Sequence, residues 1–97
     1  MKMRVLSEQL DQSEGLRVLE FGANWCGYCI AAQKDIETVL TDHPDLPHEK
    51  IADGPGRPLG RSFRVKLWPT LIRLRDGEEI NRVVRPSNSE HVRKLFA

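Results

Sequence analysis

The chain has 97 residues with a formal net charge of +1, and its 39% hydrophobic and 30% charged residues are typical of an ordinary soluble globular protein. Two cysteines are too few for the disulfide scaffold of a small secreted protein, and no apolar stretch is long enough to span a membrane. We therefore expect one domain over residues 1–97, no membrane partner and, because the N-terminus has no signal-peptide pattern, a cytoplasmic location.

The first half of the chain predicts two strands and two helices in alternation. Residues 3–6 suit a short strand, and residues 7–15 suit a helix with a hydroxyl N-cap and a C-terminal glycine. Residues 16–21 form a nearly continuous apolar run, which is typical of a strand covered on both faces. A second helix reaches about Leu40, because apolar residues recur there at helical spacing, and Pro44 follows its end.

The middle of the chain predicts a weaker strand and a short helix. Residues 48–52 are the strand candidate, and residues 53–56 are a cluster of turn-forming residues. Pro58 suits the first turn of a helix that runs to about Phe63.

The last part of the chain predicts a hairpin and a closing helix. Residues 70–75 and 79–84 flank Asp76-Gly77, which is a strong signal for a tight hairpin turn. The segment from Pro86 opens the final helix. Its expected inward-facing residues are Val92, Leu95 and Phe96.

The predicted order of elements is β-α-β-α-β-α-β-β-α. Strands that alternate with helices pair in parallel through right-handed crossovers, and the closing hairpin adds antiparallel pairing. We expect an α/β protein with three layers, α/β/α, around a central mixed sheet.

Both cysteines of the chain lie where the apolar strand passes into the second helix, as Cys26-Gly27-Tyr28-Cys29. Two cysteines three residues apart on a first helical turn are close enough to form a small disulfide ring. The N-terminus of a helix also offers unpaired N–H groups and a positive dipole end, which favour a thiolate. The pattern indicates a redox site.

The chain resembles the thioredoxin family over essentially its whole length. The resemblance depends on Trp25-Cys26-Gly27-Tyr28-Cys29, on Trp68-Pro69-Thr70, on Glu20 six residues before the first cysteine, and on the Asp-Gly hairpin. It implies the thioredoxin fold and a thiol–disulfide oxidoreductase that exchanges protein disulfides, with reduction as the expected direction. It also implies a thiol or reductase that restores the dithiol, and no cofactor.

The resemblance assigns roles to three residues around the sulfurs. Cys26 matches the exposed attacking thiol, and Cys29 matches the buried resolving thiol. Glu20 matches the buried acid that moves a proton on and off the second cysteine, with Lys50 as its expected partner. A carboxylate at a wet strand end, without function, is the alternative for Glu20.

The resemblance also implies a substrate groove. Pro69 matches a cis-proline that presents backbone to an extended substrate, and Thr70 follows it. Trp25, Gly27, Tyr28 and Trp68 would form the rim, although the two tryptophans can equally belong to the core.

Two departures from the family pattern affect the chemistry. Gly27 and Tyr28 stand where thioredoxin itself has Gly-Pro, and this pair tunes thiolate stability, so the redox poise stays open. A glycine common near the end of the last strand is replaced around Val84-Arg85, and Arg85 is in a position to crowd or charge the groove.

A zinc site is the main rival interpretation. Cys26, Cys29, His43 and His48 have the spacing of a two-Cys, two-His finger. The helix begins at the cysteines, however, and intervening prolines stop the two histidines sharing a helical face. We expect no metal, and we expect His43 and His48 to be exposed loop residues.

Two further alternatives remain from the sequence alone. One is an adaptor of the same fold that binds peptides without catalysis; the other is use of glutathione, whose carboxylates the basic second half could hold. Residues 49–97 are basic but their charges are scattered, so we expect no nucleic-acid partner. We expect a monomer.

Overall fold

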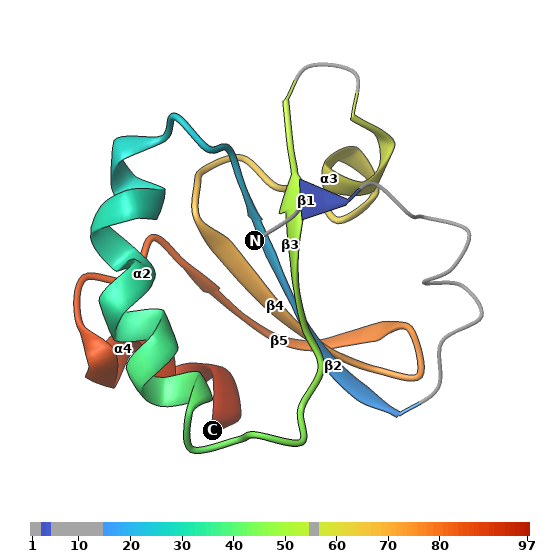
Figure 1. Cartoon of the computed structure of the whole chain (residues 1–97). Coiled ribbons are helices and arrows are strands. Elements are labelled where there is room, and N and C mark those ends of the chain that lie inside the picture. The colour runs from blue at the N-terminus through green and yellow to red at the C-terminus, as the bar shows by residue number, and fades with distance from the viewer. Residues whose placement is uncertain (1–2, 5–14, 55–56) are drawn as a thin grey trace.

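The computed structural model describes residues 3–4, 15–54 and 57–97 of the chain. In these residues, five strands form one mixed sheet in the order β1-β3-β2-β4-β5 (Figure 1). Strand β2 lies at the centre, parallel to β3 and antiparallel to β4, and β4 forms a hairpin with β5. The strands are β1 (Met3–Arg4), β2 (Leu16–Gly22), β3 (His48–Ala52), β4 (Thr70–Arg75) and β5 (Glu78–Val84).

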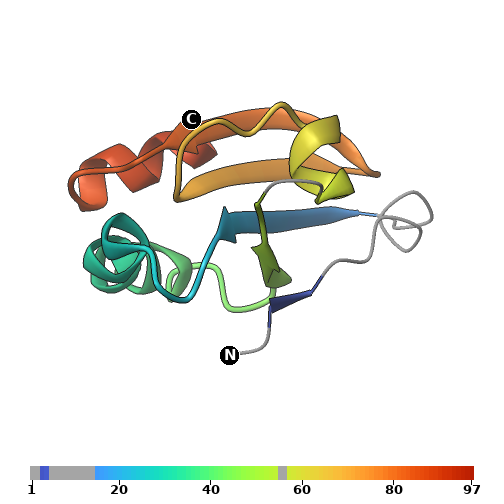
Figure 2. The ribbon, with the colours of Figure 1, turned by 90° about the horizontal axis from the view of Figure 1, so that it is seen from above.

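The helices lie on both faces of this sheet. Helix α2 (Gly27–Leu40) and helix α4 (Ser89–Arg93) lie on one side, and helix α3 (Pro58–Ser62) lies on the other (Figures 1 and 2). A short 3-10 helix, η1 (Lys94–Phe96), continues α4. The three-layer α/β/α arrangement predicted from the sequence is confirmed for the described residues.

Strand β2 is buried on both faces, as its apolar sequence predicts. Val18 packs into a core cluster with α2 and α4, while Leu19 and Phe21 pack into a second cluster with α3. Adjacent residues of a strand point to opposite faces, so this one strand contributes to both cores. Glu20, next to Leu19 and two residues after Val18, therefore points toward α2.

The β4–β5 hairpin confirms the Asp-Gly turn signal. Asp76 and Gly77 have φ values of 51° and 84°, as a two-residue turn with two left-handed residues requires. Strand β5 begins at Glu78, one residue earlier than the sequence predicts.

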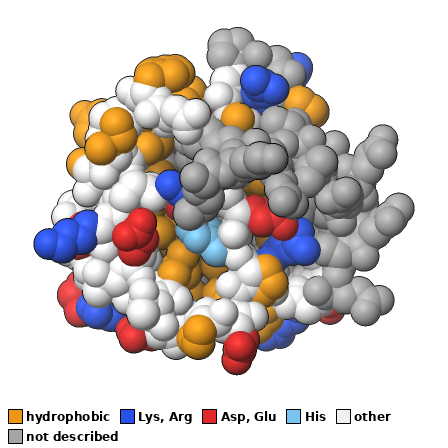
Figure 3. Space-filling view, in the orientation of Figure 1, with side chains coloured by type: hydrophobic (Ala, Val, Ile, Leu, Met, Phe, Trp, Pro, Cys, Tyr) orange, Lys and Arg blue, Asp and Glu red, His pale blue; other side chains and the backbone are white. Residues whose placement is uncertain are grey.

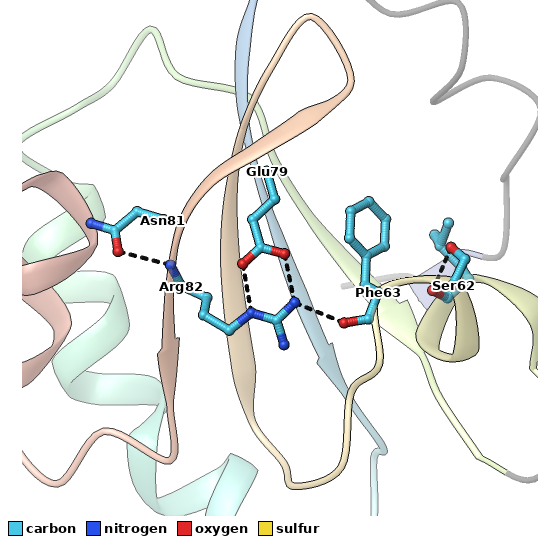
Figure 4. Close-up of polar contacts among 6 residues, drawn as sticks. Ser62, Phe63, Glu79, Asn81 and Arg82 are labelled. Atoms are coloured by element: carbon cyan, nitrogen blue, oxygen red, sulfur yellow. Dashed lines mark hydrogen bonds and ion pairs between the residues drawn. The ribbon is translucent and has the colours of Figure 1, made fainter.

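Arg82 of β5 connects the hairpin to the segment that follows α3 (Figure 4). Its guanidinium donates to both carboxylate oxygens of Glu79, and Nη2 also donates to the carbonyl of Phe63 at 2.7 Å. The hydrogen bond with Glu79 raises the pKa of Arg82. Arg82 therefore anchors the segment at Phe63, which leads into the Trp68-Pro69 loop.

The other predicted elements are found with small changes of bounds, and some predictions lie outside the described residues. These are the helix over residues 7–15, the end of the first strand at residues 5–6, and two residues of the turn at 53–56. Among the described residues, no helix is long and apolar enough to cross a membrane.

Candidate active site

The turn between β2 and α2 places the first sulfur at a helix N-terminus. Cys26 is the N-cap of α2, and its backbone N–H donates to the carbonyl of Ala23 at 3.2 Å. Its Sγ accepts the backbone N–H of Cys29, also at 3.2 Å. Helix N-termini leave N–H groups without helical partners, and here one of them is directed at the sulfur that the sequence assigns to attack.

The two cysteines are free thiols, and both are buried, each with 5% of its surface exposed. The expectation that Cys26 is exposed is therefore wrong for this state. Ala23 and Cys29 pack around Cys26, and Trp68, from a distant loop, packs against this cluster. Exposure does not distinguish the two sulfurs, so the difference between them is chemical.

Burial raises the pKa of the Cys29 thiol from 9.0 to about 12, with the hydrogen bond to Cys26 as the next cause. Taking a thiolate out of water is costly, and Cys29 has the Cys26 sulfur and Glu20 as electronegative neighbours. Cys29 is therefore a protonated thiol at neutral pH. It can attack a disulfide only if a nearby group removes its proton.

We expect this raised pKa to make the reduced protein less stable in alkaline solution. The Cys29 thiol has a pKa of 9.0 in the unfolded chain and of about 12 in the folded protein. This difference stabilises the folded state fully below pH 9.0, and the stabilisation is lost as the pH rises toward about 12. In urea denaturation above about pH 9, reduced wild type should lose up to about 1.4 kcal/mol per pH unit relative to reduced Cys29→Ser. The oxidised protein, without free thiols, is the control. Parallel stability curves for the two reduced proteins would contradict the raised pKa.

Gly22 at the end of β2 allows the Cys29 sulfur to lie close to the strand. A Cβ atom at Gly22 would lie 2.6 Å from Sγ of Cys29, which real contacts do not allow. At Gly27, by contrast, a Cβ atom meets nothing within 4 Å. The lack of a side chain is therefore required for packing at Gly22 but not at Gly27.

We expect Gly22→Ala to lower the free energy of unfolding by about 1–3 kcal/mol, because the added methyl group must displace the buried sulfur. The closure of the 26–29 disulfide should slow as well. Gly27→Ala is the matched control for stability, and it should be neutral or stabilising by up to about 1 kcal/mol. Denaturation curves of both variants test this, and equal losses would remove the special role of Gly22.

Glu20 is buried, with 3% of its surface exposed, and it is held by a polar network. Its Oε2 accepts from Nε2 of Gln33 at 2.7 Å, and its Oε1 lies 3.0 Å from Nε2 of His48. Lys50 donates to Oε1 of Gln33 rather than to Glu20. The burial of Glu20 excludes the alternative that it is a solvated carboxylate at a strand end. The prediction that Lys50 pairs directly with Glu20 is wrong, because Gln33 lies between the two side chains.

The prediction that His43 and His48 are exposed loop residues is wrong for His48 and right in part for His43, which lies in a loop but is only partly exposed. His48 is the first residue of β3 with an 18% exposed side chain against Glu20, and the ring of His43 stacks on Phe96 at 3.9 Å. The four residues of the rival zinc motif do not converge. Over the residues that the structure describes, no group of three or more potential ligands is placed to hold a metal ion.

The Trp68–Pro69 peptide bond is cis, as the family resemblance predicts. Trp68 lies edge-on to Trp25 at 5.5 Å between ring centroids, and its Nε1 donates to Oδ2 of Asp53 at 2.8 Å. Asp53 in turn lies against Gly60 of α3, so closely that a Cβ atom at position 60 would collide with its carboxylate. Trp25 is 77% exposed, which excludes a core role for it.

Thr70 does not offer its side chain to a substrate. It is 1% exposed, and its hydroxyl donates to the carbonyl of Leu67 at 2.6 Å. Its backbone is paired within the sheet, opposite Phe21 and Val84. The prediction of Thr70 as a substrate-binding residue is therefore wrong for the side chain, which closes the turn around the cis-proline.

Arg85 lies between the cysteine turn and the cis-proline loop. It has a left-handed φ of 45°, and its guanidinium stacks over the ring of Tyr28 at 3.9 Å. Its Nε donates to the carbonyl of Trp68 and its backbone N–H to that of Pro69, both at 2.8 Å. Tyr28 itself is 61% exposed. Arg85 thus places a positive charge between Tyr28 and the cis-proline, where the sequence departs from the family pattern.

A free dithiol at the N-terminus of a helix, beside a cis-proline loop and above a buried carboxylate, defines a site for thiol–disulfide exchange. The family model described as Thioredoxin matches residues 2–97, so the chain belongs to the thioredoxin family. The family and the paired cysteines establish it as a thiol–disulfide oxidoreductase that acts on protein disulfides.

Individual relatives agree with this assignment. A thioredoxin of Chlamydia pneumoniae is 30% identical over 94 residues, which cover 95% of this chain and 92% of that protein. The structure of reduced thioredoxin 2 from Pseudomonas aeruginosa PAO1 is 47% identical with a TM-score of 0.85, covering 99% of this chain and 89% of that one. A Nicotiana alata thioredoxin is 28% identical with a TM-score of 0.74, covering 93% and 78%.

Proposed function

We propose that the chain reduces protein disulfides, with Cys26 as the attacking sulfur and Cys29 as the resolving sulfur. The observation that carries this assignment is the N–H of Cys29 directed at the Cys26 sulfur, together with the raised pKa of Cys29. The Cys26 thiolate attacks a substrate sulfur and forms a mixed disulfide, releasing the first substrate thiolate. Cys29 then attacks the Cys26 sulfur, which releases the second and leaves a 26–29 disulfide.

Glu20 is the proposed acid–base group of the second step. Cys29 must lose its proton as it attacks, and Glu20 is the buried carboxylate nearest to it along the polar network. Gln33 supports this arrangement because its amide donates both to Glu20 and to the carbonyl of Cys29. A buried carboxylate in this position accepts the proton where water has little access.

The proposed substrate groove lies between the cysteine turn and the cis-proline loop. Backbone at Pro69 would receive an extended substrate, with Trp25, Gly27, Tyr28 and Trp68 around it. Exposed aromatic rings suit such a rim, because they gain contact area at a low cost in conformational entropy. Arg85 adds a positive charge to this rim.

Reduction is the proposed direction because it is the direction that the resemblance to thioredoxins implies. Reductants of this class have potentials of about −270 mV, and oxidants have potentials of about −120 mV. A glutathione redox titration should place the 26–29 couple below about −230 mV. A potential near that of the oxidants would reverse the proposed direction.

An insulin disulfide reduction assay tests the function itself. Wild type should turn over with a dithiol donor, and Cys26→Ser should not. Absence of turnover in wild type would favour a peptide-binding adaptor, and activity confined to glutathione mixed disulfides would favour the glutathione alternative. The chain is proposed to work as a monomeric single domain in the cytoplasm without a cofactor, and a thiol or a reductase would restore its dithiol.

A further inference from the structure

The carboxylate of Glu20 touches one group that can carry its proton away. Among the described residues, the side chains that share a hydrogen bond with it are those of Gln33 and His48. The amide of Gln33 does not titrate. The ammonium group of Lys50 donates its hydrogen bond to Gln33 and not to Glu20. An imidazole both accepts and releases a proton near neutral pH. His48 is therefore the contact of Glu20 that is suited to proton transfer.

The other side of His48 reaches solvent. Its side chain is 18% exposed and lines an open depression of about 260 Å³ with Glu37 and His43, among others. Figure 3 shows histidine at the surface in the middle of this face, in a hollow with hydrophobic side chains below it. The imidazole thus lies between the buried carboxylate of Glu20 and water.

A second, smaller depression lies beside Glu20 and the resolving cysteine. It has a volume of about 90 Å³ and is lined by Glu20 and Cys29, with Gln33 and Lys50 as further polar groups. Water needs only on the order of 10–15 Å³ and two or more polar partners to occupy such a site. A water at this position would connect the Cys29 thiol to the Glu20 carboxylate.

We propose that His48 relays the proton of the resolving step between Glu20 and solvent, an inference that rests on the proposed function. As Cys29 attacks the Cys26 sulfur, its proton moves to Glu20 and the substrate leaves as a thiolate. Glu20 then passes the proton to Nε2 of His48, which accepts it when the ring is in the Nδ1–H tautomer, and Nδ1 releases its proton to water. Proton exchange with solvent restores the Nδ1–H tautomer. No electrons move in these transfers, and Glu20 returns to its carboxylate form for the next cycle.

Several charged or titratable groups surround His48. Glu20 of β2 contacts it, and Glu37 of α2 and His43 of the connection between α2 and β3 line the same depression. Lys50, two residues further along β3, donates to Gln33. The relay predicts that the pH dependence of resolution changes when His48 is replaced and is retained when His43 is replaced. His43→Ala is the matched control, because His43 borders the same depression without contacting Glu20.

The test is a single-turnover measurement that separates attack from resolution. His48→Ala should form the mixed disulfide at the wild-type rate and resolve it about 10-fold to 100-fold more slowly at neutral pH. Free imidazole in the buffer should restore the rate. His48→Gln, whose amide can still donate to Glu20 but cannot titrate, should stay slow, and imidazole should not restore it. His43→Ala should resolve at the wild-type rate.

Two results would overturn the relay. Resolution at the wild-type rate in His48→Gln would mean that only the hydrogen bond to Glu20 matters. Failure of imidazole to accelerate a folded His48→Ala protein would mean that no proton passes through this position. A wild-type protein that forms no mixed disulfide would instead contradict the proposed function, so the two failures are distinguishable.

Discussion

Replacing Cys26 by serine is expected to reduce insulin disulfide reduction to the uncatalysed background, whereas Cys29→Ser is expected to trap substrates as mixed disulfides. A serine hydroxyl at position 26 is not ionised at neutral pH and cannot attack a disulfide. A serine at position 29 leaves the attack intact but removes the sulfur that releases the substrate. Multiple turnovers are then lost in both variants, but only Cys29→Ser should retain one equivalent of bound substrate, which mass spectrometry can measure.

The double variant, with serine at positions 26 and 29, is the control for non-covalent capture and should yield no trapped complexes. Alkylation with iodoacetamide gives an independent test of the same division of labour. The N–H directed at the Cys26 sulfur and the raised pKa of Cys29 predict that Cys26 is alkylated much faster at neutral pH. Equal alkylation of the two thiols would contradict the assigned roles.

Glu20→Gln is expected to slow resolution about 100-fold while the attack by Cys26 keeps nearly its wild-type rate. The amide has almost the shape of the carboxylate but cannot take the proton of Cys29. Stopped-flow single-turnover kinetics across a range of pH separate the two steps, and the resolving rate should rise more steeply with pH than in wild type. An unchanged pH–rate profile would remove Glu20 from the mechanism.

Glu49→Gln is the matched control for this substitution. The substitution replaces a carboxylate by an amide, as Glu20→Gln does, but on the adjacent strand β3. There the Glu49 carboxylate pairs with Arg17 at 3.0 Å. That pair is partly exposed and is not part of the network around the sulfurs. Both kinetic steps should keep their wild-type rates in this variant.

The parts of the fold that the sequence predicts well are those with a strong local pattern. The apolar run of β2, the helical spacing of α2 and the Asp76-Gly77 turn each carry their own signal within a few residues. These three elements, with the cysteines between the first two, also position most of the site. The family resemblance added the cis peptide bond at Pro69, which no local pattern indicates.

The missed features depend on contacts between distant segments. Cys26 is buried partly by Trp68, about forty residues later, and no pattern near the cysteines indicates that cover. His48 and Lys50 lie on the same face of β3, but only the register that pairs Glu20 with Lys50 brings the imidazole to the carboxylate. The alternation within residues 48–52, combined with that register, is the signal that could have found His48.

The contact between Asp53 and Gly60 places a steric constraint on α3, the helix that lies across the sheet from α2. Any residue other than glycine at position 60 must push the Asp53 carboxylate aside, and the indole of Trp68 then loses its tether. If Trp68 lines the substrate groove, as we propose, a substitution at Gly60 would change the choice of client proteins from the opposite side of the sheet. Engineering of α3 offers a remote way to reshape client preference while both sulfurs remain untouched.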